Sequence, residues 1–107
     1  MSDFSPLGVL EEQVLVAVIR TQHDAYGMHV RREIERVTGR ELAIGAVYAT
    51  LDRLEAKGLL SSRRTMSDMS RRCFQLTAAG SRALSETYEM RQRLWQGVDP
   101  RRLVLSR

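Results

Sequence analysis

Arginine carries nearly all of the positive charge in this sequence, and many of the arginines occur in adjacent pairs. Lys57 is the only lysine among 17 basic residues. A guanidinium group donates several hydrogen bonds in one plane, which matches both a phosphate and the edge of a guanine. The arginines that we select as candidate phosphate or base ligands are Arg31, Arg32, Arg53, Arg63, Arg71 and Arg72. Their chemistry favours a polyanionic partner.

The same arginines are also compatible with ordinary surface roles. Arg31 and Arg32 begin a run that is broken by Glu33, and charge runs usually face solvent. The pairs at 63–64 and 71–72 flank a polar stretch, where charged side chains can protect the edge strands of a small sheet. Charge alone therefore leaves a phosphate-binding surface and a solvated surface open.

A helical stripe between residues 44 and 57 leaves mostly small side chains on its opposite face. The stripe consists of Ile44, Val47, Leu51 and Leu54, whose spacing predicts the buried side. The other side carries Gly45, Ala46, Ala49, Asp52 and Arg53. Small residues let a helix approach base edges closely, and an alanine methyl can contact a thymine methyl. Tyr48 lies on the flank, where its hydroxyl reaches either a phosphate or only water.

The residue types needed for catalysis or metal binding do not form a recognisable pattern. His23 and His29 lack cysteine or carboxylate partners at metal-ligand spacing, so we predict surface or turn histidines. Cys73 is the single cysteine, and packing is a commoner role for it than redox sensing. No nucleophile, base and orienting group can be named together. We predict a protein that is not an enzyme and uses no cofactor or metal.

The composition bounds the class of protein. The chain has 107 residues, 43% of them hydrophobic and 28% charged, with a net charge of +4. This length and composition fit one soluble domain. No basic signal-peptide region opens the sequence, and no apolar run approaches the roughly 18 residues of a membrane span. We therefore expect a cytoplasmic protein without a membrane partner.

The apolar periodicity predicts the elements that must position these side chains. We expect helices at 6–21, 26–38, 44–57 and 78–96, and strands of a hairpin at 59–66 and 71–77. Gly39 and Gly58 stand where helices usually end. The predicted fold class is mainly α with a small β hairpin, a winged helix-turn-helix plus a C-terminal helix. In that arrangement the third helix lies in a major groove and the hairpin, or wing, touches the flanking backbone.

The last helix has large side chains and few predicted elements to cover them. A second copy of the chain is the simplest cover for such a face. The residues of this helix that we expect in the interface of a homodimer are Leu84, Tyr88, Arg91 and Trp95. We divide the chain into a DNA-binding domain at 1–79, a dimerisation helix at 80–97 and a short tail at 98–107.

Four segments carry a family resemblance. They are LGVLEEQVLVAVIR at 7–20, AYGMHVRREIE at 25–35, AIGAVYATLDRLEAKGLL at 43–60 and CFQLTAAG at 73–80. In this order and spacing the sequence resembles the PadR family of bacterial transcriptional regulators over residues 7–96. The resemblance implies a dimeric winged-helix repressor whose single C-terminal helix and first helix form the dimer, which adds Leu10 and Val14 to the expected interface. It also implies that Tyr48 contacts DNA.

Two positions depart from the family pattern. Ala43 stands where the family often has a serine or threonine that caps the third helix. Cys73 precedes Phe74, where the family usually has a pair of aromatic residues. Some short family members bind planar aromatic compounds between paired tryptophans, so the resemblance makes Trp95 a candidate site for a small-molecule effector.

These observations predict a sequence-specific regulator that binds double-stranded DNA as a homodimer. It would repress by placing two third helices in successive major grooves of a pseudo-palindromic operator. Two alternatives remain open at this point. One is a winged-helix module that binds proteins and not DNA. The other is a drug-responsive repressor that binds planar aromatic ligands near Trp95.

Overall fold

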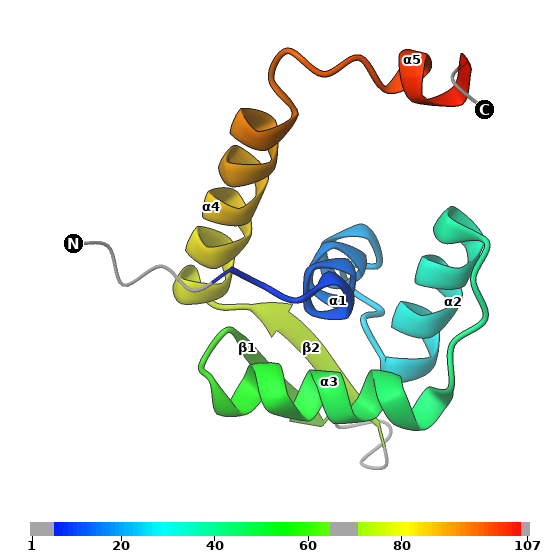
Figure 1. Cartoon of the computed structure of the whole chain (residues 1–107). Coiled ribbons are helices and arrows are strands. Elements are labelled where there is room, and N and C mark those ends of the chain that lie inside the picture. Colours follow the sequence, from blue (N-terminus) through cyan, green and yellow to red (C-terminus); the bar gives the residue numbers. More distant parts are fainter. Residues whose placement is uncertain (1–5, 65–70, 106–107) are drawn as a thin grey trace.

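Five helices and one β hairpin make up the computed structural model, which describes residues 6–64 and 71–105. In chain order the elements are α1 (Val9–Arg20), α2 (Gly27–Thr38), α3 (Ile44–Ala56), β1 (Leu60–Arg64), β2 (Arg72–Leu76), α4 (Ala78–Trp95) and α5 (Pro100–Leu105). Helices α1 to α3 and the hairpin form the body of the molecule, and α4 rises from it (Figure 1). This order confirms the predicted winged helix-turn-helix with an added helix.

The hydrophobic core gathers around α1. Helix α1 packs against α2, α3, β2 and α4. Val14 and Leu15 on α1 are fully buried, as are Val47, Leu51 and Leu54 on α3. Residues three and four positions apart lie on the same side of a helix, so their burial shows that this side faces the core. The predicted stripe on the third helix is therefore confirmed.

The start of the first helix differs from the prediction. We expected it at Pro6, but α1 begins at Val9, with Gly8 as an extended N-cap residue. The Glu11 carboxylate accepts a hydrogen bond of 2.9 Å from the Gly8 N–H, which fixes this later start. The ends of α2 and α3 agree with the prediction, since Gly39 and Gly58 adopt φ values of 75° and 80°. Helix α3 begins after Ala43, whose side chain accepts no hydrogen bond from the first N–H groups of the helix.

The wing is a two-stranded antiparallel sheet in which Leu60 pairs with Leu76 and Arg64 with Arg72. Strand β1 begins one residue later than predicted, and β2 is shorter than predicted by one residue at each end. Residues 65–66 of the first predicted strand and the predicted polar tip at 67–70 lie outside the described residues. Phe74 is buried, and its N–H donates a hydrogen bond of 3.0 Å to the Ala25 carbonyl. This bond ties the wing to the loop that precedes α2.

Helix α4 is locked to the end of the wing by two residues. The Thr77 hydroxyl accepts a 3.0 Å hydrogen bond from the Gly80 N–H and donates one of 2.6 Å to the Gly58 carbonyl. Gly80 is buried against the Leu59 carbonyl oxygen, and a β-carbon there would overlap that oxygen. A side chain at residue 80 is therefore incompatible with this close contact between α4 and the start of the wing.

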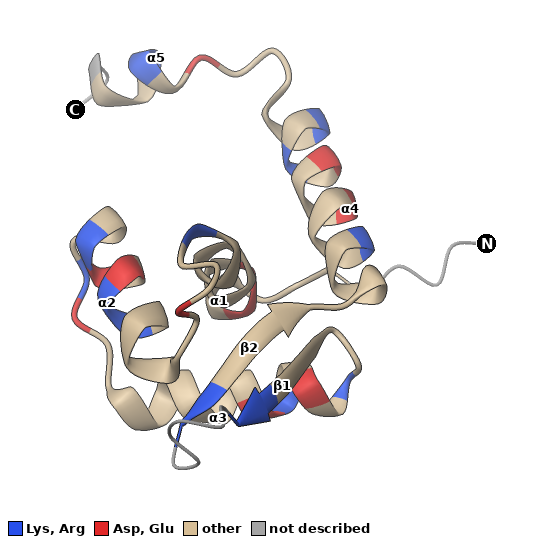
Figure 2. Cartoon of the chain, turned by 180° about the vertical axis from the view of Figure 1, so that it is seen from behind, with Lys and Arg blue, Asp and Glu red and all other residues tan. Residues whose placement is uncertain are grey.

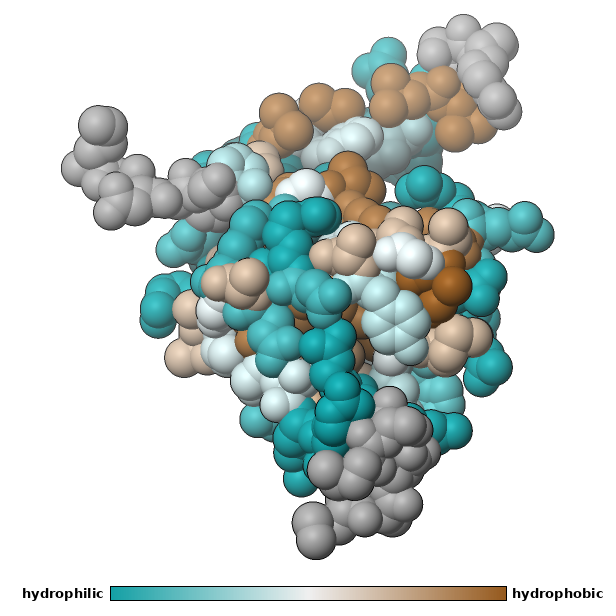
Figure 3. All heavy atoms as spheres, turned by 90° about the horizontal axis from the view of Figure 1, so that it is seen from below, coloured by the Kyte–Doolittle hydropathy of each residue, from teal (hydrophilic) through white to brown (hydrophobic). Residues whose placement is uncertain are grey.

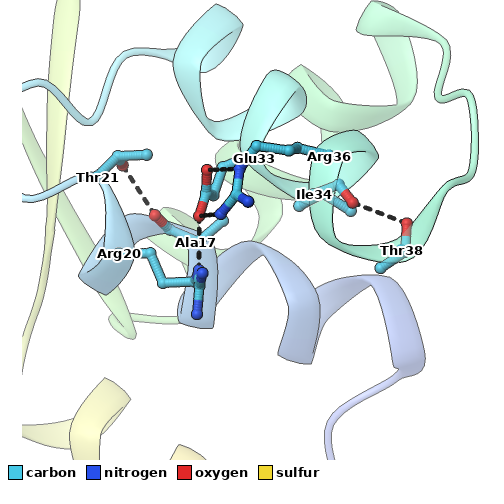
Figure 4. A network of polar contacts seen from close by, with 7 residues as sticks. All are labelled: Ala17, Arg20, Thr21, Glu33, Ile34, Arg36 and Thr38. Carbon is cyan, nitrogen blue, oxygen red and sulfur yellow. Dashed lines mark hydrogen bonds and ion pairs between the residues drawn. The ribbon is translucent and has the colours of Figure 1, made fainter.

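A polar network joins α1 to α2 (Figure 4). Glu33 accepts hydrogen bonds from Arg36 at 2.7 Å and from Arg20 at 2.6 Å. The hydrogen bond from Arg36, followed by that from Arg20, lowers the pKa of Glu33 to about 2. The bond from Arg20 crosses from α1 to α2 and helps to hold the two helices at a fixed angle, whereas Glu33 and Arg36 both lie on α2.

The C-terminal segment, predicted as a tail at 98–107, contains the short helix α5. Figure 1 shows α5 standing away from the body at the far end of α4. Leu103 and Val104 are 54% and 63% exposed. None of the described helices is long and apolar enough to cross a membrane.

Candidate nucleic-acid interface

The outer face of α3 is open and carries mostly small side chains. Gly45, Ala46 and Ala49 are exposed, together with Asp52 and Arg53. Apart from its chain neighbours and the backbone of its own helix, a β-carbon at Gly45 would meet no described atom within 4 Å. Helix α3 runs along an edge of the molecule (Figure 1), so this face can approach a partner without obstruction from the described residues.

A basic hollow of about 240 Å³ lies beside α3, between the start of α2 and the wing. We define it by its lining, which is Tyr26, Gly27, Met28, His29, Arg32, Tyr48, Arg64, Arg71 and Arg72. No described residue of this lining is acidic. Figure 2 shows the positively charged ends of β1 and β2 meeting beside α3. Figure 3 looks onto this side of the molecule, where hydrophilic side chains form a band. Such a concavity suits a phosphate.

Tyr48 forms the α3 wall of the basic hollow and is 39% exposed. Its ring lies against Gly27, where a β-carbon would overlap the ring atoms. Glycine at residue 27 therefore lets the phenol lie across the first turn of α2. The Tyr48 hydroxyl lies beside Gly27, another residue of the lining, and a phosphate bound in the hollow could accept its hydrogen.

Tyr26 and His29 form the α2 side of the basic hollow. The Arg71 guanidinium lies 5.1 Å from the centre of the Tyr26 ring, within range of a cation–π contact. The Tyr26 and His29 rings meet edge to face, with centroids 5.7 Å apart. Sequence reasoning placed His29 only on the surface or in a turn. Its spacing of three residues from Arg32 on one helix was the signal that could have placed it here.

Arg32 and Arg63 are exposed cations on α2 and on the wing. Arg32 lines the basic hollow, whereas Arg63 lies on β1 and lines a separate hollow with residues of α1 and β2. Neither has an ion-pair partner within residues 6–64 and 71–105. Both can therefore neutralise a phosphate without breaking a contact among these residues.

Two other predicted DNA ligands, Arg72 and Arg31, already make contacts that hold the fold together. Arg72 bonds to Asp52 at 2.6 Å and to Glu55 at 3.2 Å, and lies 4.9 Å from the Phe74 ring centre. Arg31 donates a 2.8 Å hydrogen bond to the Leu42 carbonyl. Arg72 thus joins the wing to α3, and Arg31 fixes the segment that leads into α3. In this conformation both guanidinium groups are already bonded to other groups of the same chain.

Arg53 also takes part in an internal cluster. It lies 3.5 Å from the Glu11 carboxylate, which receives a shorter hydrogen bond of 2.8 Å from Lys57. The bond from Lys57 lowers the pKa of Glu11, helped by the Gly8 N–H and opposed by burial. The cluster joins the start of α1 to the end of α3. About half of the Arg53 side chain is nevertheless exposed on the outer face of α3.

The predicted dimer residues differ in how much of their surface a partner could contact. Tyr88 and Trp95 on α4 are 61% and 42% exposed, and Leu10 and Leu84 are partly buried. Arg91 is engaged with Glu12 of α1, with its Nε 3.0 Å from Glu12 Oε1. Val14 is fully buried in the core, so it offers no surface that a partner could contact. Its place in the predicted interface is therefore corrected to the core.

Two further hollows lie on the α1–α4 side. An apolar groove of about 350 Å³ between α1 and α2 is lined by Val9, Val16 and Val37, among others. A second hollow of about 520 Å³ surrounds Trp95 and Val98 at the end of α4. No group of three or more metal-ligating side chains occurs among the described residues.

Comparison with known proteins identifies related regulators. The model of the transcriptional regulator PadR-like family matches residues 14–86. Transcriptional regulator Rv3488 of Mycobacterium tuberculosis is 38% identical over 65 residues, which is 60% of this chain and 60% of that protein. The chain thus matches less than two thirds of this relative's length.

Solved structures share the fold over nearly the whole chain. RosR of H. salinarum is 25% identical with a TM-score of 0.73, covering 97% of this chain and 91% of RosR. BldR of Sulfolobus solfataricus, a transcriptional regulator, is 21% identical with a TM-score of 0.66, covering 94% and 69%. At the lower identity the likeness concerns the fold alone. Because the family model spans more than half of its length, the chain belongs to the PadR-like family of transcriptional regulators.

Proposed function

We propose that the protein is a homodimeric repressor that binds a pseudo-palindromic operator. The observation that carries this proposal is the basic hollow beside the small face of α3. Small residues on one helix can approach base edges, and cations and a phenol next to them can hold the phosphates that flank the same groove. A protein-binding module has no need for this pairing of two surfaces.

In the proposed complex the outer face of α3 enters a major groove. Gly45, Ala46 and Ala49 come close to the base edges, and Arg53 reaches a guanine or a phosphate from the same face. The basic hollow receives a backbone phosphate between Arg32, Arg71 and the Tyr48 hydroxyl. The wing, through Arg63, follows the backbone beyond it. Because few long side chains on α3 reach the base edges, we expect modest sequence specificity.

The proposed dimer uses α4 and its surroundings. Tyr88, Leu94 and Trp95 expose large apolar or aromatic surfaces on this helix. A homodimer with two-fold symmetry would cover both copies of this face and carry the two α3 helices to successive major grooves about one helical turn apart. Bound in this way, the dimer represses by occupying the promoter.

A second candidate function adds an effector to this repressor. Trp95 borders the hollow at the end of α4, which is large enough for a planar aromatic compound. Among structural neighbours, DNA binding by BpsR of Bordetella bronchiseptica is regulated by 6-hydroxynicotinic acid. A ligand beside Trp95 would change the angle between the two wings and so release DNA. Trp95 fluorescence quenched by a planar compound, together with DNA release at the same concentration, would support this candidate.

The main proposal is tested by fluorescence anisotropy with two labelled duplexes of equal length. One carries the DNA upstream of the protein's own gene and the other a random sequence, each titrated at several salt concentrations. Light scattering gives the mass of the protein alone. We expect a dimer that prefers the upstream duplex, with affinity that falls steeply as salt rises. A dimer without duplex affinity at low salt would contradict the proposal and favour a protein-binding module.

A further inference from the structure

We infer that His29 is a DNA-contact residue that takes up a proton when a backbone phosphate enters the basic hollow. The inference rests on the proposed function, because the hollow in which His29 would meet a phosphate is the one that binds DNA in that proposal. It adds a histidine to a hollow whose other ionisable side chains are arginines and tyrosines, and so makes DNA affinity depend on pH.

The hydrogen bonding of the imidazole defines which nitrogen is available. Nδ1 of His29 lies 2.8 Å from the carbonyl oxygen of Asp24. A carbonyl oxygen only accepts hydrogen bonds, so Nδ1 carries the hydrogen and donates it. In the neutral ring Nε2 is then an unprotonated acceptor. Addition of one proton to Nε2 makes the ring a cation with a second N–H donor, without breaking the bond to Asp24.

The surroundings of the ring explain why a phosphate would favour that proton. The groups that face the hollow with His29 are Tyr26 from the preceding loop, Arg32 on α2, Tyr48 on α3, and Arg64, Arg71 and Arg72 on the wing. Asp24 contributes its carbonyl from the same loop as Tyr26. None of the described side chains lining the hollow is an anion. A bound phosphate would supply the negative charge that stabilises an imidazolium.

The geometry also holds the ring in place before DNA arrives. The bond to Asp24 restrains one edge of the ring, and the edge-to-face contact with Tyr26 restrains its plane. Tyr26 is itself covered by the Arg71 guanidinium at 5.1 Å. A side chain that its neighbours already hold in place loses little conformational entropy when it binds a phosphate. His29 is therefore suited to contact the phosphate directly.

The proton balance is simple and can be measured. The proton comes from the buffer and adds to Nε2, so each protomer takes up at most one proton through His29. The affinity for DNA then rises as the pH falls through the range in which histidines titrate. Across two pH units we expect the wild-type Kd to change by at least about tenfold, because uptake of one proton by each protomer changes the affinity of the dimer by at most about hundredfold per pH unit.

The experiment is calorimetric titration of the dimer with its upstream duplex near neutral pH, in two buffers that differ in ionisation enthalpy. The difference in observed heat gives the number of protons taken up. His29→Gln keeps a hydrogen-bond donor without a titratable ring. His23→Gln is the matched control, because His23 is the only other histidine and does not line the basic hollow. Melting curves at the same pH establish that each variant is folded.

We expect proton uptake by the wild type and by His23→Gln, and its loss in His29→Gln. Nuclear magnetic resonance of the wild-type imidazole nitrogens gives a second measurement that needs no variant, and should show Nε2 of His29 protonated only in the complex. Equal proton uptake by wild type and His29→Gln, or an unprotonated Nε2 in the complex, would overturn this inference and leave the repressor proposal standing. Absence of duplex binding at low salt would overturn both.

Discussion

The difference between Arg32 and Arg72 offers a direct test of how the basic hollow binds DNA. Both arginines line the hollow, but only Arg72 is bonded to Asp52 and Glu55. Arg32 has no ion-pair partner in the described part of the chain. If Arg32 neutralises one phosphate in each protomer, then Arg32→Ala removes two such contacts from the dimer. Arg72→Ala removes instead a charge that the protein has already compensated.

The expected magnitudes follow from counterion release. Each neutralised phosphate contributes about 0.9 to the slope of log affinity against log salt, so Arg32→Ala should reduce that slope by about 1.8 for the dimer. Between about 50 mM and 200 mM salt, this makes the affinity loss of the variant about 12-fold smaller than that of the wild type. Arg72→Ala should leave the slope nearly unchanged. It should lower the free energy of unfolding by about 1 kcal/mol, because it removes partly exposed ion pairs and a cation–π contact.

The assay is fluorescence anisotropy of one labelled duplex with each variant over the same range of salt, with urea unfolding of each variant in parallel. Arg82→Ala on the exposed part of α4 is a charge-matched control, since Arg82 does not line the basic hollow. If Arg32→Ala and Arg82→Ala give the same slope, the hollow does not bind phosphate. If Arg72→Ala lowers the slope as much as Arg32→Ala, its ion pairs must open when DNA binds.

Three further outcomes follow from the packing and charges. Gly80→Ala should lower the free energy of unfolding by about 1–3 kcal/mol in urea, because the new methyl overlaps the Leu59 carbonyl; an unchanged midpoint would show that this contact is loose. The Arg36 hydrogen bond keeps the pKa of Glu33 near 2, below 4.5, so its stabilisation is present above pH 4.5 and lost as pH falls towards 2. Glu33→Gln should flatten this acid dependence in thermal melts, and equal pH profiles would contradict the ion pair. Tyr88→Glu on exposed α4 should produce monomers in light scattering, whereas a persistent dimer would place the interface elsewhere.

Much of the fold could be predicted from local patterns. The α3 stripe and the glycine helix ends at residues 39 and 58 were correct, because burial of one helix face and a positive φ each depend on only a few neighbouring residues. The start of α1 was wrong by one turn for a related reason. Ser5 and Pro6 resemble a helix start, but the bond between Glu11 and the Gly8 N–H sets the observed one.

The sequence by itself therefore determined the order of elements, the open face of α3 and the membership of a regulator family. Only the tertiary structure decided which side chains meet. Arg32 on α2, Tyr48 on α3 and Arg71 just before β2 line one hollow, together with His29. Adjacent arginines such as Arg71 and Arg72 have the same chemistry in the sequence, yet one covers Tyr26 while the other is bonded to α3. The physical reason is that ion pairing and stacking depend on distances between segments far apart in the chain, which local periodicity does not encode.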